Sequence, residues 1–147
     1  MAVYRRFEDL QVWQDSRVLN KALFDILKDR DDKSFGFLIN HIFKTAGSVM
    51  DNIAEGFERN GKKEFIQFLS ISKASAGELK SQLYRALDCE IISIKELESL
   101  IEKSNSIIAQ LVLFMKYLQA SKRRGSKYED VSLEYEENLN WESFFNS

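Results

Sequence analysis

The sequence contains no proline and only one cysteine and one histidine among its 147 residues. Because proline disrupts helix interiors and is frequent in the loops of mixed and β folds, its absence favours long helices joined by short connections. The lone Cys89 has no partner in this chain for a disulfide, which fits a reducing compartment. His41 alone cannot complete the usual ligand set of a zinc site. These absences point to a chain stabilised by its apolar core.

Long hydrophobic runs are also missing. No apolar stretch approaches the roughly 20 residues that span a bilayer, and the first residues lack the apolar run of a signal peptide. We therefore expect a cytoplasmic protein with no membrane partner. The length suits one domain with a sizeable core.

The charges are nearly balanced, with a net charge of −2. Residues 1–122 contain 18 Lys and Arg against 17 acids, whereas residues 123–147 contain 3 against 6. A nearly neutral body gives no overall attraction to nucleic acid. Residues 123–147 also contain several large apolar side chains. We treat them as an acidic, aromatic extension that is either flexible or docks on another subunit or partner.

What is present is helical periodicity. Apolar residues recur with a period near 3.6 in four segments, 8–29, 35–56, 62–90 and 94–122. Ser93 followed by Glu96 has the spacing of a capping box at the start of the fourth segment. The sequence therefore predicts an all-α domain of four helices over residues 1–122.

The connection between the second and third segments contains the most informative polar residues. Gly56 is expected to end the second helix in a left-handed conformation, and Asn52 falls on an inward stripe, where a buried amide needs partners. We interpret Asn52, Glu55, Gly56, Arg59 and Glu78 as a hydrogen-bonded structural joint, with a ligand or interface role as the alternative.

Two further glycines lie inside predicted helices. Glycine costs roughly 1 kcal/mol relative to alanine in a helix interior, and close approach of a neighbouring helix offsets that cost. Gly47 and Gly77 are therefore predicted to mark tight helix crossings. The Glu-x-x-His pattern of di-metal helix bundles is absent. We expect no metal, no cofactor, no small-molecule substrate and no enzymatic activity.

Basic residues form two small groups. One consists of Lys44, Arg59, Lys62 and Lys63, near the connection between the second and third helices. The other follows the fourth helix and consists of Lys122, Arg123, Arg124 and Lys127. Both are candidate contacts for nucleic acid or a protein partner, although patches of this size are a weak signal.

Three motifs in this order resemble a known family. They read FEDLQVWQ at residues 7–14, SVMDNIAEG at 48–56, and FIQFLSIS followed by SAGEL at 65–79. Together they are similar to the bacterial four helix bundle protein family. Its members include proteins encoded in intervening sequences of large-subunit ribosomal RNA genes, and its relatives include accessory proteins of diversity-generating retroelements.

The resemblance implies an antiparallel up-down-up-down four-helix bundle that assembles into a homopentameric ring. It also implies relatives that bind nucleic acid and a reverse transcriptase through a basic surface. This chain departs from the family at residues 41–44, which contain one cation where paired arginines are common. The acidic extension lies outside the recognised pattern.

The apolar faces of the first and fourth helices look wider than one core requires, at Trp13, Phe24, Leu113 and Tyr117. Surplus apolar area is typical of subunit contacts. We expect a non-enzymatic homo-oligomeric scaffold or assembly protein that engages RNA or a nucleoprotein partner. The alternative is a protein–protein interaction module with no nucleic-acid contact.

Overall fold

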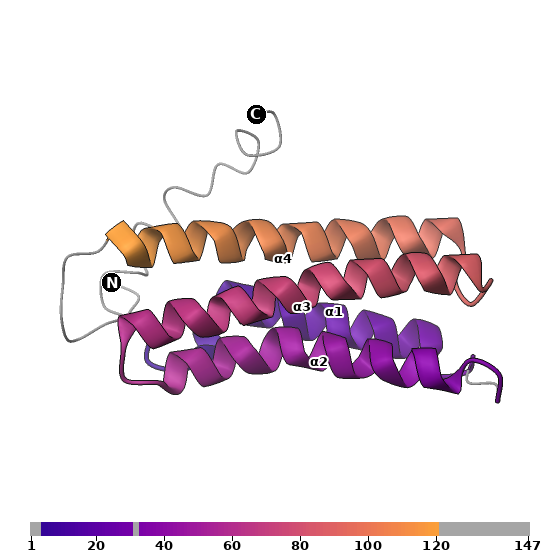
Figure 1. Cartoon of the computed structure of the whole chain (residues 1–147), viewed down its shortest axis with the longest axis horizontal. Coiled ribbons are helices and arrows are strands. Elements are labelled where there is room, and N and C mark those ends of the chain that lie inside the picture. The colour runs from indigo at the N-terminus through magenta and orange to yellow at the C-terminus, as the bar shows by residue number, and fades with distance from the viewer. Residues whose placement is uncertain (1–3, 31–32, 121–147) are drawn as a thin grey trace.

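A computed structural model describes residues 4–30 and 33–120 (Figure 1). Four long helices lie side by side along the longest axis: α1 (Gln11–Leu27), α2 (Gly36–Glu58), α3 (Lys62–Asp88) and α4 (Ile94–Ala120). A short 3-10 helix, η1 (Phe7–Asp9), precedes them. The described residues include no strand. The all-α prediction is confirmed, and the arrangement is consistent with a four-helix bundle.

The ends of the helices differ from the predicted ones for local reasons. The first segment is broken at Leu10, whose extended backbone (φ −73°, ψ 125°) separates η1 from α1. The third helix ends at Asp88, because Glu90 adopts a left-handed conformation (φ 61°) that stops it. Residues 121–147, which include the end of the predicted fourth helix and the whole extension, lie outside the described residues.

The core consists of the predicted apolar stripes. Phe65 and Phe114 are fully buried and pack edge to face, with ring centroids 5.2 Å apart. Full burial of such a side chain stabilises the fold by about 1.5–3 kcal/mol. The centre of α2 contributes Ile39, Ala46 and Ile53, each at most 2% exposed. These apolar contacts between helices are the main source of stability.

Buried hydrogen bonds also connect α2 and α3. Ser72 Oγ of α3 donates to the backbone oxygen of Val49 in α2 over 2.6 Å. Further along, Gln82 Nε2 donates to Thr45 Oγ1 over 3.0 Å. The later residue of α3 thus pairs with the earlier residue of α2. Buried polar groups need such partners, so these bonds restrict how α2 and α3 can slide past each other.

Gly56 does not end α2, and that prediction is wrong. The helix continues to Glu58, and Gly56 lies inside it. The glycine is needed because α3 lies very close: a β-carbon at residue 56 would be 2.7 Å from Phe68 Cβ and 2.9 Å from Phe65 Cδ2. Such distances leave no room for any larger residue.

The tight crossings predicted at Gly47 and Gly77 are also wrong. A β-carbon at Gly77 would meet nothing within 4 Å, and one at Gly47 would only touch the side chain of Asp51, on its own helix, at 4.0 Å. Both glycines lie on the outer side of their helices. A sequence shows that a helix contains a glycine, but it does not show which side of the helix faces a neighbour.

The start of α4 is tied to the end of α1. Ser93 Oγ accepts from the Glu96 backbone N–H (3.2 Å), and Glu96 Oε1 accepts from the Ser93 N–H (2.9 Å), so the predicted capping box is confirmed. Arg30 Nη1 and Nη2 donate to Glu96 Oε1 and Oε2 over 2.7 and 2.9 Å. This contact lowers the pKa of Glu96 to about 2, mainly through the hydrogen bonds from Arg30.

Candidate functional site

The connection between α2 and α3 brings together part of the predicted joint. Arg59 Nη2 donates to Glu55 Oε1 over 3.0 Å, and the Arg59 guanidinium lies 5.2 Å from the ring centre of Phe68. The same phenylalanine packs against Gly56. Arg59 therefore links the end of α2 to the first turns of α3. Both charged side chains of this pair are about half exposed.

Asn52 reaches α3 indirectly. Its side-chain amide donates to the backbone oxygen of Ser48 (2.7 Å) and to Ser48 Oγ (2.9 Å), and Ser48 Oγ lies 2.9 Å from Ser75 Oγ of α3. The half-buried amide is thereby partnered within the fold. This network links α2 to α3.

Glu78 does not belong to this joint. Its Oε1 lies 3.7 Å from His41 Nε2 and 3.5 Å from Gln82 Nε2, and its side chain is 56% exposed. It is 13 residues from Phe65 along α3, which corresponds to roughly 20 Å of helix. Of the five residues predicted for the joint, Glu55, Gly56 and Arg59 lie at the connection. Asn52 bonds to Ser48 one turn earlier, and Glu78 lies apart.

The cations of the first basic group are also divided. Arg59, Lys62 and Lys63 lie at the connection between α2 and α3, whereas Lys44 is roughly 22 Å away along α2. The acids Glu55, Glu58 and Glu64 flank the same connection. Three cations and three acids give no local excess of positive charge. Lys122, Arg123, Arg124 and Lys127 lie outside the described residues.

Large apolar side chains are exposed on every one of the four helices. The most exposed are Phe37 at 78%, Ile94 at 62% and Val18 at 57%. Tyr84, Phe24 and Ile71 are between 43% and 51% exposed. Of the residues that the sequence suggested, Phe24 is in this set, whereas Trp13 is half-buried and packs edge to face on Phe7.

Phe37, the most exposed of these residues, was missed by the sequence analysis. It lies one position before the buried Leu38, so it falls off the inward stripe of α2 by about 100°. That angular offset from the apolar stripe is the sequence signal that indicates an exposed Phe37. Its ring centre lies 6.1 Å from that of His41, one turn further along the helix.

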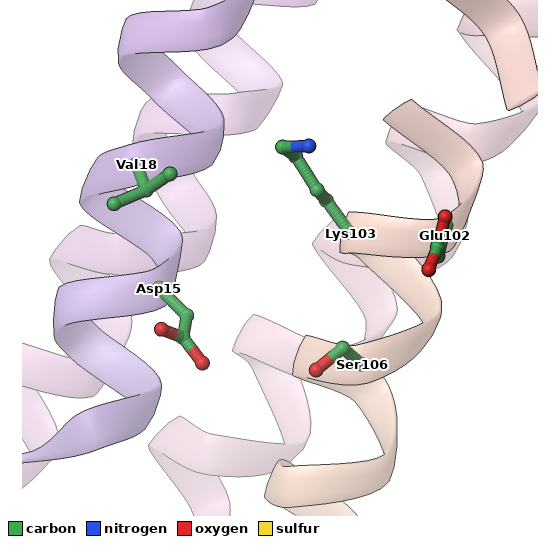
Figure 2. Close-up of a pocket in the computed structure, with 5 residues that line it drawn as sticks. All are labelled: Asp15, Val18, Glu102, Lys103 and Ser106. Atoms are coloured by element: carbon green, nitrogen blue, oxygen red, sulfur yellow. The ribbon is translucent and has the colours of Figure 1, made fainter. Parts of the chain in front are cut away.

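An open cavity of about 240 Å³ lies between α1 and α4 (Figure 2). Its walls are formed by Asp15 and Val18 of α1 and by Glu102, Lys103 and Ser106 of α4. Figure 2 shows Asp15 and Ser106 pointing toward each other across the gap.

Two of the charged groups that line this cavity already have partners. The Asp15 carboxylate accepts from Gln11 Nε2 (2.8 Å) and from Gln110 Nε2 (2.6 Å), while Lys103 Nζ donates to Ser99 Oγ (3.2 Å). Val18 supplies an exposed apolar surface beside them. The cavity is therefore suited to an apolar or aromatic group more than to a charged one.

Two other findings bear on chemistry. Among residues 4–30 and 33–120, no three His, Cys, Asp or Glu side chains are grouped closely enough to hold a metal ion. Within the same part of the chain, no helix combines the length and apolar character needed to cross a membrane.

Residues 4–30 and 33–120 thus form a four-helix arrangement with exposed apolar side chains and with balanced charges at the connection between α2 and α3. Comparison with family models gives a more specific result. The model of the 23S rRNA-intervening sequence protein matches residues 8–112, and the chain belongs to this family. A search of curated proteins finds no match. The family match agrees with the resemblance carried by residues 7–14, 48–56 and 65–79.

Proposed function

We propose that the protein is a non-enzymatic, cytoplasmic scaffold that acts as a homo-oligomer of antiparallel up-down-up-down bundles. The observation that carries the proposal is the exposure of large apolar side chains, led by Phe37, Ile94 and Val18. Exposed apolar area beyond what a monomer needs is typical of surfaces that bind other proteins. A second copy of the chain is the partner that is always available.

The topology has support within the chain. Ser72 pairs with Val49 and Gln82 pairs with Thr45, so positions along α3 and α2 run in opposite order. The contacts of α1 with α4 follow the same rule, since Asp15 pairs with Gln110 and Arg30 with Glu96. An alternating up and down course of the helices accounts for both sets.

The number of copies is proposed from the family resemblance, which implies a ring of five.

Native mass spectrometry and sedimentation at micromolar concentration test this assembly. We expect a species of five times the 17.1 kDa chain mass. Phe37→Glu should weaken it, because a charge replaces the most exposed apolar side chain. Asn40→Glu, on the exposed side of the same helix, is the matched control and should leave it intact. A monomer at these concentrations would contradict the scaffold.

An RNA or nucleoprotein partner is proposed because the family is described by an intervening sequence of 23S rRNA. The described charges favour the alternative, a module that binds proteins alone, since Arg59, Lys62 and Lys63 are matched by three acids. Filter binding to ribosomal RNA fragments across a salt series separates the two. Phosphate contacts predict affinity that falls steeply with salt. Absence of binding at low salt would eliminate the RNA partner.

A further inference from the structure

The middle of α4 contains no charged residue. Residues 104–115 include no Asp, Glu, Lys or Arg on any side of the helix. A helix that is apolar around its whole circumference is normally buried on all sides, and this stretch, with eight apolar residues of twelve, approaches that composition. In Figure 1, α4 forms one edge of the four-helix arrangement, so the other helices cover only part of it.

One residue on the side of α4 that faces away from the core is nevertheless buried. Leu111 is fully buried in the core, and at about 100° per residue both Ala109 and Leu113 lie about 160° around the helix from it. Ala109 is only 2% exposed, yet among the buried apolar residues in the described part of the chain it alone does not belong to the contiguous core cluster. Leu113 is half-buried. We call the surface around Ala109 and Leu113 the outer face of α4.

The outer face continues into the cavity between α1 and α4. Ser106 and Glu102, three and seven residues before Ala109, lie on the same side of the helix and line that cavity. Val18 of α1 extends it with an apolar side chain that is 57% exposed. Small side chains at Ala109 and Ser106 leave room for a large group. Figure 2 shows Glu102 and Ser106 on the α4 side of the cavity and Asp15 and Val18 on the α1 side.

We propose that the outer face of α4 and the adjoining cavity bind residues 128–147 of the same chain. Leu113 lies seven residues before Ala120, the last described residue of α4, which is roughly 10 Å along the helix. Ser106 is roughly 21 Å from the same point. The 27 residues that follow Ala120 reach up to about 90 Å when extended, which is ample for a chain that turns back.

The composition of residues 128–147 suits the outer face of α4 and the adjoining cavity. The segment contains the aromatic side chains Trp141, Phe144 and Phe145, which suit a cavity lined by the apolar Val18. It also contains six acids and no cation. Lys116, exposed beside the outer face, can pair with those acids. Because Asp15 and Glu102 also line the cavity, the aromatic part occupies the cavity and the acidic part lies along the helix near Lys116.

Tryptophan fluorescence in the full-length protein tests the proposal. The chain has two tryptophans, Trp13 and Trp141, so Trp13→Phe leaves Trp141 as the only emitter and keeps an aromatic ring against Phe7. We expect blue-shifted emission and low quenching by iodide. Leu113→Glu should red-shift the emission and raise the quenching constant several-fold. Ile71→Glu, which changes an exposed apolar residue of α3, should leave both unchanged.

A second variant separates release of the segment from loss of folding. Lys116→Glu replaces an exposed side chain with one that repels the acidic segment, and it should raise quenching while the helical circular-dichroism signal stays constant. The proposal would be overturned if Trp141 were solvent-exposed in the Trp13→Phe protein. It would also be overturned if neither Leu113→Glu nor Lys116→Glu changed the quenching. Loss of Trp141 protection on dilution would overturn it too, because the outer face of α4 would then bind a segment of another copy. A monomer with protected Trp141 supports this inference while contradicting the scaffold.

Discussion

Gly56 in α2 and Phe68 in α3 approach so closely that a β-carbon at residue 56 would lie 2.7 Å from the Cβ of Phe68. Gly56→Ala should therefore destabilise the fold by about 1–3 kcal/mol, because α2 and α3 must move apart to admit the methyl group. Urea denaturation measures the change in the free energy of unfolding.

Gly77→Ala is the matched control for Gly56→Ala. The added methyl group meets nothing within 4 Å, so alanine should stabilise α3 by up to about 1 kcal/mol through its higher helix propensity. Equal effects of the two substitutions would show that the close approach at Gly56 is not what restricts that position.

The contact between Arg30 and Glu96 should make stability depend on pH. The pKa of Glu96 is lowered to about 2 in the folded protein, whereas the unfolded chain has the ordinary value of 4.5. The carboxylate therefore stabilises the fold fully above about pH 5, and this contribution is lost as the pH falls toward 2. Glu96→Gln should cost about 1 kcal/mol at pH 7, since solvent screens a partly exposed pair, and should flatten the acid limb of the profile.

Asp25→Asn provides the comparison for Glu96→Gln. The Lys21–Asp25 pair is equally short, at 2.8 Å, but both side chains are at least half exposed. Its removal should change the free energy of unfolding by less than about 0.5 kcal/mol. A loss as large as that of Glu96→Gln would mean that the hydrogen bonds of Glu96 to Arg30 and Ser93 add nothing.

Glu90 is the one described non-glycine residue with positive φ, at 61°. It ends α3 in a Schellman arrangement, in which the Ile91 N–H donates to Ala86 O and the Glu90 N–H to Leu87 O, both at 2.9 Å. Glu90→Gly should stabilise the protein by about 0.5–1 kcal/mol, because glycine adopts this conformation without the steric cost of a β-carbon. Thermal unfolding followed by circular dichroism measures the shift.

Asp88→Gly is the control for Glu90→Gly. Asp88 is the last residue of α3, so glycine there should weaken the final helical turn. If both glycine variants lowered the melting temperature, the left-handed conformation of residue 90 would not be a source of strain.

Thr45 and Gln82 should show strong coupling. Gln82 is 3% exposed, its Nε2 donates to Thr45 Oγ1, and its Oε1 is buried without a hydrogen-bond partner among the described residues. Thr45→Val alone leaves the amide poorly paired and should cost about 1–3 kcal/mol. Thr45→Val combined with Gln82→Leu replaces both polar groups and should cost less than the sum of the single changes. Strict additivity in denaturation experiments would contradict the pairing.

Local features were predictable from the sequence because they depend on neighbours in the chain. The stripe that includes Leu69, Ala76 and Leu83 is buried as its spacing predicts. The capping box of Ser93 and Glu96 forms within four residues, and its bonds are present. The phase of the α2 stripe likewise places Phe37 about 100° away from the buried Leu38.

Features that depend on a facing helix were not predictable. Gly47, Gly56 and Gly77 look alike in sequence, and only Gly56 faces a bulky side chain across a helix interface. Glu78 shares a helix with the joint residues but reaches His41 instead, because its position along α3 places it beside the middle of α2.

The sequence by itself determined the helices, since periodic apolar spacing, absent proline and a capping box act within a few turns of the chain. It also determined the family, through three motifs in order. Only the tertiary structure decided which glycine is crowded, which charged groups pair, and that the outer side of α4 is covered at Ala109. Those outcomes depend on distances between segments far apart in sequence, which local spacing does not encode.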